Sequence, residues 1–405
     1  MKKRRLIIIF SAILFVIAIG IGVYAGFNRS NQIVSTVPGR TTTGSFPISS
    51  GGSSQTSTDT FPTTSNTQGS YVEDDDPSAV FAAQKAALSQ LTQKTAVGFW
   101  ITDLGVLHYI DQQGTITQVL SGQESDIASS PFGSPVSVVS SPDGLWTAVL
   151  FASGTWGLFD GEGRAWVDMG NDIESAVFSP DSSQLAFLRR DTSGVAVLYT
   201  QSLTATKQTL IKVLSLSLRD VFLRWPSAKK IILLPRQSAA IASEQIWSID
   251  LSSKTLSLLD SGKAIGATFS LADGSYMRFE TDGGGSSVTV SAVGADGVGA
   301  TMPFWSFEDK CVFAQLGTYA LCGAPASQDV AIRLLPDDYL KGNVYFKDFI
   351  YKVSFDGGVR VGLVFSAADV ALDTTQWRSW GDMFYFINRL DGRVYSFDWM
   401  SANGQ

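Results

Sequence analysis

Most of the chain alternates between short apolar runs and polar turns. The recurring unit is an apolar strand, a short polar turn and a second apolar strand. Runs of this length, separated by turn residues, are typical of β-hairpins. Seven copies of the unit can be aligned, at residues 106–120, 156–169, 196–210, 245–259, 287–300, 350–363 and 393–400.

A second hairpin precedes every copy except the first, most clearly at 137–151 and 176–188. Two hairpins in roughly 45 residues match the four strands of a β-propeller blade. The sequence therefore predicts an all-β fold, a β-propeller of seven four-stranded blades, with six or eight blades as alternatives. The last copy lacks one strand, which residues 87–93 would supply to close the ring. A short helix over 77–92 is the competing prediction for that segment.

The clearest turns read Ser-Pro-Asp, at 141–143 and 179–181. Proline presets φ for a turn, aspartate bonds nearby backbone N–H groups, and Gly144 accepts a positive φ. A catalytic carboxylate would not recur at blade spacing and then be replaced in the weaker copies. We therefore interpret Asp143 and Asp181 as corner residues.

These turns and their flanking strands resemble the WD40-like (PD40, TolB-like) propeller repeats of bacterial envelope proteins. The resemblance covers roughly residues 95–400, and neither the Gly-His nor the Trp-Asp pair of true WD40 repeats recurs. The segments 309–325 and 334–353 resemble a group of bacterial proteins with an N-terminal membrane anchor and one propeller. The resemblance implies this fold and topology, and it implies no particular activity.

The N-terminus predicts the location of the protein. Residues 1–5 are basic and predicted to be cytoplasmic, and residues 6–27 carry no charge. Twenty-two helical residues span roughly 33 Å, enough to cross a bilayer, and the positive-inside rule places the rest outside the cytoplasm. We predict a single-pass signal anchor in the plasma membrane, with a cleaved signal peptide ending near residues 23–25 as the alternative.

Residues 28–76 are rich in Ser, Thr and Gly and show no apolar periodicity. Such a composition cannot bury enough surface to order itself, which predicts a disordered stalk. Residues 77–405 are then the propeller domain. The net charge of −7 and the pI of about 4.9 argue against a nucleic-acid partner.

Cys311 and Cys322 are the only cysteines and fall in one predicted hairpin. With its tip at 316–317 they lie directly opposite each other, at the roughly 5.5 Å Cα spacing of a hydrogen-bonded pair, which is compatible with a disulfide. Export would allow oxidation. The alternative is two buried thiols.

An insertion at 326–343 lengthens the sixth repeat, and long loops on rigid scaffolds often carry function. Aromatic and charged residues there and at nearby blade corners are typical of interfaces. The alternative is that the loop covers a blade edge and the tryptophans pack between blades. The candidate partner-binding residues are Trp305, Pro336, Asp337, Asp338, Tyr339, Lys341, Trp377, Arg378 and Trp380.

Catalytic motifs are absent from the sequence. There is no Gly-x-Ser-x-Gly, phosphate-binding loop or metal-ligand pattern, and His108, the single histidine, sits in a strand pattern. We therefore predict no catalytic, cofactor or metal residues, and a non-catalytic platform that binds a protein in the cell envelope. The alternatives are glycan or small-ligand binding in the central channel, and a propeller-type lyase or hydrolase. The sequence leaves the oligomeric state undetermined.

Overall fold

The computed structural model describes residues 84–402, except 204–208, 283, 328–333, 357 and 367–369. The chain divides into two compact units, Met1–Tyr71 and Val72–Gln405, and every described residue belongs to the second. The transmembrane helix predicted over 6–27 and the stalk predicted over 28–76 lie outside the described residues. No helix in the described part is both long enough and apolar enough to cross a membrane.

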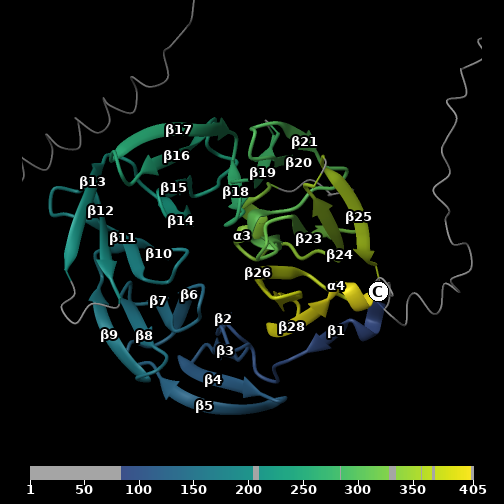
Figure 1. Cartoon of the computed structure of the whole chain (residues 1–405), viewed down its shortest axis with the longest axis horizontal. Coiled ribbons are helices and arrows are strands. Elements are labelled where there is room, and N and C mark those ends of the chain that lie inside the picture. The colour runs from purple at the N-terminus through teal and green to yellow at the C-terminus, as the bar shows by residue number, and fades with distance from the viewer. Residues whose placement is uncertain are drawn as a thin grey trace, which may run out of the picture. The chain divides into compact units, whose positions relative to one another are not determined.

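Seven four-stranded antiparallel sheets are arranged in a ring (Figure 1), which confirms the predicted fold and blade number. Each sheet is one blade, and strands follow one another from the inside outward. Blades 1 to 4 comprise β2 (Gly98–Ile101), β3 (Leu107–Ile110), β4 (Thr115–Leu120) and β5 (Gln123–Ser129); β6 (Pro135–Ser140), β7 (Trp146–Phe151), β8 (Trp156–Asp160) and β9 (Ala165–Gly170); β10 (Ile173–Phe178), β11 (Gln184–Arg190), β12 (Ala196–Ser202) and β13 (Leu210–Leu216); and β14 (Val221–Ser227), β15 (Lys230–Pro235), β16 (Glu244–Asp250) and β17 (Thr255–Gly262).

The remaining blades carry the short helices of the described part. The 3₁₀ turn η1 (Glu308–Lys310) precedes blade 6, and α3 (Asp337–Leu340) lies in its insertion. The helix α4 (Trp399–Ala402) follows the last strand. Blades 5 to 7 comprise β18 (Gly266–Phe269), β19 (Tyr276–Thr281), β20 (Val288–Val293) and β21 (Gly299–Thr301); β22 (Cys311–Phe313), β23 (Tyr319–Pro325), β24 (Asp348–Ser354) and β25 (Arg360–Phe365); and β26 (Thr374–Trp380), β27 (Met383–Asn388), β28 (Arg393–Asp398) and β1 (Leu88–Gln90).

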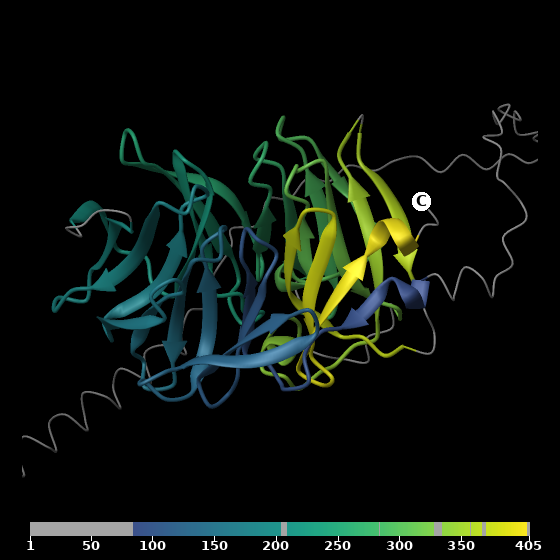
Figure 2. The same cartoon turned by 60° about the horizontal axis from the view of Figure 1, so that its bottom comes forward.

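The ring closes as predicted, through a strand from the beginning of the domain. Strand β1 pairs with β28, with Leu88 opposite Phe397, and the two strands lie side by side in Figure 2. Residues 84–86 just before it are helical. The two predictions for this segment therefore each hold in part, and the earlier portion of the expected helix over 77–92 lies outside the described residues.

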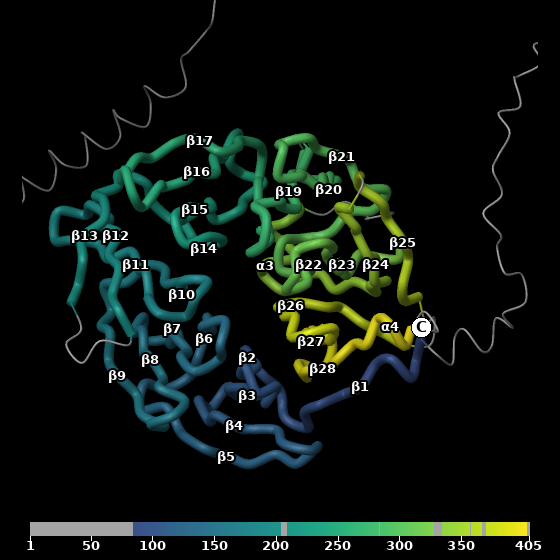
Figure 3. Tube along the Cα trace, viewed as in Figure 1, coloured from purple at the N-terminus to yellow at the C-terminus, as the bar shows by residue number. Residues whose placement is uncertain are grey.

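The hydrophobic core lies between neighbouring blades. One cluster joins Leu321 and Ile350 of blade 6 to Phe384 and Phe397 of blade 7. The first strand of each blade faces the middle of the ring, as Figure 3 shows for β2, β6, β10, β14 and β26.

The Ser-Pro-Asp turns are corners, as predicted. The Asp143 carboxylate accepts the backbone N–H of Leu145 at 3.0 Å, inside its own turn. The backbone N–H of Asp143 donates to Ser182 Oγ in the next blade, and its carbonyl accepts from Asp103 in the previous one. In the matching turn, the bond from Ser179 Oγ is the main cause that lowers the pKa of Asp181.

A disulfide bond joins Cys311 and Cys322, which face each other across β22 and β23. Their Cα atoms lie 4.2 Å apart. The predicted spacing of a hydrogen-bonded pair, roughly 5.5 Å, is therefore wrong. A Cα spacing near 4.5 Å is that of a non-hydrogen-bonded pair in an antiparallel sheet. Both residues are buried in the core of blade 6.

The corner turn yields a prediction about stability. Gly144 has φ of +70°, and a Cβ there would lie 2.4 Å from the carbonyl oxygen of Ile101. Gly144→Ala should therefore lower the free energy of unfolding by about 3 kcal/mol, from backbone strain plus the clash. Urea denaturation measures the loss. Gly122→Ala is the matched control, since φ is +76° there with no atom within 4 Å, and it should cost about 1 kcal/mol. Equal losses would contradict the role of the close contact.

Candidate functional site

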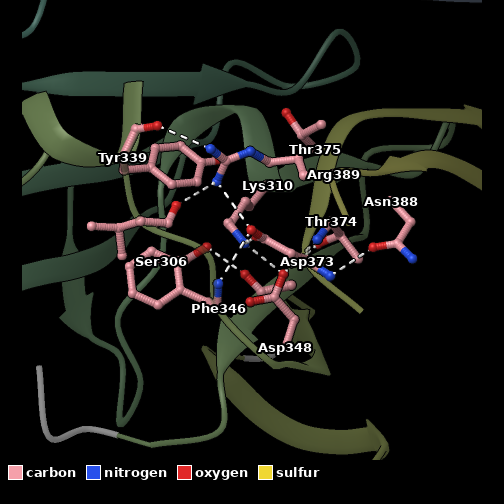
Figure 4. Close-up of polar contacts among 12 residues, drawn as sticks. Ser306, Lys310, Tyr339, Phe346, Asp348, Asp373, Thr374, Thr375, Asn388 and Arg389 are labelled. Atoms are coloured by element: carbon pink, nitrogen blue, oxygen red, sulfur yellow. Dashed lines mark hydrogen bonds and ion pairs between the residues drawn. The ribbon is translucent and has the colours of Figure 1, made fainter. Parts of the chain in front are cut away.

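The insertion between β23 and β24 is anchored on a buried group of charged side chains. Lys310, at the end of η1, lies 2.6 Å from a carboxylate oxygen of Asp348 and 2.5 Å from one of Asp373. All three side chains are fully buried. Arg389, in the turn after β27, pairs with the other oxygen of Asp373 at 3.1 Å. We call these four residues the ion cluster (Figure 4).

The charges of the ion cluster balance, with two cations facing two anions. Asp348 also accepts hydrogen bonds from the backbone N–H and the hydroxyl of Thr374, at 2.7 and 2.9 Å. Burial raises the pKa of Asp348, and the charge of Lys310 opposes that shift. A buried ion pair compensates its desolvation better when further hydrogen bonds complete the geometry. Thr374 supplies two such bonds to one oxygen of Asp348, while the other oxygen has no hydrogen-bond partner among the described residues.

Tyr339 of α3 connects the insertion to the ion cluster. Its ring stacks on Phe307 with centroids 4.0 Å apart, and the Arg389 guanidinium covers it at 4.1 Å. Its hydroxyl donates to Asp309 at 2.8 Å. Burial first, and then the charge of Asp309, raises the pKa of Tyr339 well above its usual value. Tyr339 is therefore held as a neutral, buried anchor.

The other end of α3 is fixed to blade 4. The carboxylate of Asp337 accepts from Ser238 Oγ at 3.0 Å and from the Ala239 backbone N–H at 2.7 Å. The backbone N–H of the same Ser238 donates to a carboxylate oxygen of Glu244 at 3.2 Å. The insertion thus connects blade 4, blade 6 and blade 7 through side-chain contacts.

Burial raises the pKa of Glu244 from its ordinary 4.5 to about 7, and the nearby charge of Asp337 adds to the shift. The side chain is buried at the start of β16. One carboxylate oxygen of Glu244 has no hydrogen-bond partner in the described structure. A protonated carboxyl group is favoured in such a place.

The predicted partner-binding residues fall into two groups. Trp305, Tyr339 and Trp377 are buried, and Trp377 packs on Phe386. Trp380 is partly buried over Gly105. Pro336 precedes α3 and follows a cis peptide bond, and the carboxylate of Asp338 accepts the Leu334 backbone N–H. Lys341 is exposed, whereas Arg378 on β26 is partly buried. The structure brings the insertion residues together, while Trp377, Arg378 and Trp380 lie on the neighbouring inner strand. Binding by any of them stays a prediction.

Three exposed apolar residues stand at or next to the contacts of Arg389 along the chain, and sequence reasoning did not find them. Leu340, Tyr345 and Leu390 are 53%, 55% and 46% exposed. Arg389 donates to the carbonyls of Tyr339 and Val344, and its guanidinium lies 5.0 Å from the Tyr345 ring centroid. We call Leu340, Tyr345 and Leu390 the insertion patch.

The ion cluster was also missed from the sequence. Asp348 begins β24, whereas Lys310, Asp373 and Arg389 stand directly beside β22, β26 and β27. Their only mark in the sequence is that each of these charged residues stands at the boundary of an apolar strand. That signal is common in hairpin proteins, so it could not single out this group.

His108 is packed in blade 1, consistent with the interpretation from sequence. Its ring stacks on Trp100 with centroids 5.7 Å apart. Burial lowers the pKa of His108 to about 4, so it is neutral at physiological pH. Within the described residues, no group of three or more histidine, cysteine, aspartate or glutamate side chains could hold a metal ion.

Comparisons with known proteins show the fold alone. No protein-family model and no curated protein matches the sequence. Solved structures similar to this chain include an oligogalacturonate lyase from Vibrio parahaemolyticus, at 10% identity and a TM-score of 0.52, over 77% of this chain and 93% of that one. A chain of a mitotic checkpoint complex matches at 10% identity and 0.51, over 77% and 90%. The protein U3-55K matches at 11% and 0.50, over 77% and 98%.

The ion cluster yields a prediction about stability. Lys310→Met should lower the free energy of unfolding by about 3–5 kcal/mol, because Asp348 would lose its cation and Arg389 alone would be left to compensate two buried carboxylates. Chemical denaturation measures the change. Lys94→Met is the control, since the Lys94–Asp126 pair is exposed and should contribute less than about 1 kcal/mol. Similar losses in both variants would contradict the structural role of the ion cluster.

Glu244 yields a prediction about pH. A carboxyl group whose pKa is raised by folding stabilises the fold below its unfolded pKa, and that stabilisation is lost as pH rises through the folded pKa. Because Glu244 ionises at lower pH in the unfolded chain than in the folded one, the free energy of unfolding should fall as pH rises from about 4.5 to 7. In Glu244→Gln this part of the decline should disappear. Denaturation curves across that range test it, and parallel pH profiles of the two proteins would refute it.

Proposed function

We propose that this protein is a non-catalytic scaffold that binds a protein partner through the insertion patch. The observation that carries the proposal is the exposure of Leu340, Tyr345 and Leu390, which stand at or next to the residues that the anchored Arg389 contacts. Exposed apolar side chains that gather at one place, with polar groups around them, are typical of interaction sites.

Anchoring makes the insertion patch suitable for binding. The loop is attached to blade 4 through Asp337 and to the ion cluster through Tyr339. A surface that is already ordered loses little conformational entropy when a partner binds, so more of the contact energy appears as affinity. Tyrosine and arginine are also enriched among residues that dominate binding energy.

The location of the scaffold is part of the same proposal. We infer that residues 6–27 anchor the chain in the plasma membrane and that residues 28–76 hold the propeller outside the cytoplasm, in the cell envelope. The supporting features are the basic residues 1–5, the uncharged apolar run after them, and the resemblance to TolB-like repeats. The partner would then be another envelope protein.

A lyase or hydrolase is the less favoured function. One similar structure is an oligogalacturonate lyase, but at 10% identity the likeness extends to the fold alone. The single histidine is stacked on Trp100 and neutral. Lys310, Asp348 and Asp373 of the ion cluster are fully buried and the charges of the cluster are paired, so it supports a structural role better than a chemical one.

Affinity capture from envelope extract tests the scaffold function. The full chain, solubilised from the membrane, is compared with a variant carrying Leu340→Ser, Tyr345→Ser and Leu390→Ser. We expect a specific protein to be retained by the parent and reduced more than tenfold by the variant, as for loss of central contacts.

The matched control is Leu256→Ser with Leu258→Ser on the outer strand β17, where both side chains are exposed. This variant should retain the partner at the parent level. A partner that survives the insertion-patch substitutions, or is lost equally in the control, would contradict the proposed surface.

A further inference from the structure

The outer strand of blade 5 ends before it has covered its neighbour. β21 has three residues, whereas the outer strands of blades 1, 2, 3, 4 and 6 have six to eight. It pairs with residues 291–293 of β20 (Figure 1), and one further bond follows, from the Met302 N–H to the Val290 carbonyl at 2.8 Å. In blade 7, where β1 is also short, backbone bonds of Leu91 and Ala87 continue the pairing at both ends. The beginning of β20 has no such cover.

The uncovered edge presents backbone groups at Val288 and Val290. In an antiparallel strand the N–H and C=O of one residue point to the same side, and every second residue points to that side. Because the Val290 carbonyl bonds Met302, the N–H groups of Val290 and Val288 point outward too. Thr281, which pairs with Val288 on β19, turns its own N–H to the Lys263 carbonyl, away from β20. Neither outward N–H donates a hydrogen bond within the described residues, so each needs a partner from outside.

A cleft of about 280 Å³ runs along this edge, lined by residues 286–290, 301–305 and Leu335. We call it the β20 cleft. The Leu335 N–H donates to the Gly285 carbonyl at 2.8 Å, which fixes the insertion beside the start of β20. None of the lining residues is charged. Its apolar residues Val288, Met302, Phe304, Trp305 and Leu335 are buried, and its hydroxyl residues Ser286, Ser287, Thr289 and Thr301 are exposed.

Trp305 adds an unused donor to the β20 cleft. The residue is only 6% exposed, and its ring packs edge-on against Phe307 and Phe346, with centroids 5.7 and 5.1 Å away. Its Nε1–H makes no hydrogen bond within the described residues. That nitrogen is not sealed from solvent, unlike Nε1 of Trp377, which is buried without a partner. Buried tryptophans usually find a partner for this group, and here a ligand in the cleft can supply it.

We propose that the β20 cleft binds an extended peptide segment that carries no charged side chain where it enters the cleft. The segment would lie where other blades have the rest of their outer strand, and its carbonyls would accept the N–H groups of Val288 and Val290. Adding a strand to a free sheet edge is a general mode of peptide recognition, in which backbone bonds give affinity and side-chain pockets give specificity.

The size and charge of the β20 cleft favour this occupant. Its volume is close to that of the smallest ligand pockets, about 300 Å³, which suits one side chain of a peptide better than a whole cofactor. The uncharged lining offers no partner to an ionic ligand. Asp282, in the turn before β20, is engaged by the backbone N–H and the hydroxyl of Ser286 at 2.8 and 2.6 Å. Backbone groups, hydroxyls and apolar contacts therefore determine what binds.

Selection from a displayed library of random peptides tests this site, with the full chain solubilised from the membrane as the target. Enriched sequences are made as fluorescent peptides, and their affinity is measured by anisotropy. We expect enriched peptides to be uncharged at the positions that enter the cleft. Only every second N–H of an added strand faces β20. N-methylation of one alternate set of peptide N–H groups should therefore abolish binding, and methylation of the other set should leave it.

Three variants locate the binding. Val288→Pro removes an outward N–H without breaking the ladder, because a strand tolerates proline at an unpaired edge, and it should weaken peptide binding about tenfold. Trp305→Phe keeps an aromatic ring but removes the N–H, and should weaken binding about fivefold. Thr289→Pro is the structural control. Its N–H faces β19, so this variant should lower the unfolding midpoint more than Val288→Pro does.

The combined Leu340→Ser, Tyr345→Ser and Leu390→Ser variant separates this site from the insertion patch. It should bind the enriched peptides like the parent, because none of its residues lines the β20 cleft. Failure of either site then leaves the other standing. The inference is overturned if no peptide is enriched, if Val288→Pro and Trp305→Phe both bind like the parent, or if the two methylation patterns have equal effects. Loss of peptide binding in the combined variant would also overturn it.

Discussion

The propeller depends on the pairing of β1 with β28. Three residues from the start of the domain, Leu88–Gln90, complete a blade whose other strands come from its end. The pairing continues outside the ladder, where the backbone N–H of Leu91 donates to the Val394 carbonyl at 2.9 Å. Without this strand, β28 would be an exposed edge and blade 7 would be held only by its contacts with blade 6 and blade 1. Closure therefore fixes the positions of all inner strands together.

The insertion uses the ring that closure provides. The residues that hold α3 stand beside strands of blades 6 and 7, and its second attachment lies in blade 4. These blades have fixed separations only in a closed ring. The helix α3 can therefore stay attached on both sides. Its fixed position is a consequence of the closed ring, and the binding proposed for the insertion patch relies on that position.

The fold could be predicted from the sequence because its signals are local. Each hairpin has its own turn, as the Asp143 turn shows, and the closing strand followed from the strand missing in the last repeat. The cysteine pair also lies within one hairpin. The ion cluster could not be predicted in this way. Lys310 is 38 residues from Asp348 and 63 from Asp373, and no periodic pattern connects them.

The tryptophans show a second limit of sequence reasoning. Trp305 and Trp377 were predicted to be candidates for partner binding because aromatic residues at blade corners are typical of interfaces. Both are buried, and the same chemistry that favours interfaces also favours packing between blades. Leu340 and Leu390 had no such mark in the sequence, although they are exposed. Which apolar residue is left outside depends on how the loop folds over the ring, and this is set by contacts far along the chain.

Charge pairing explains how the ion cluster can be buried. Lys310 lies fully buried between Asp348 and Asp373, and Arg389 pairs with the other oxygen of Asp373. Two cations beside two carboxylates offset much of the cost of removing the group from water. The four side chains come from residues in or beside strands of blades 6 and 7, so the cluster can form only where the closed ring brings these strands together.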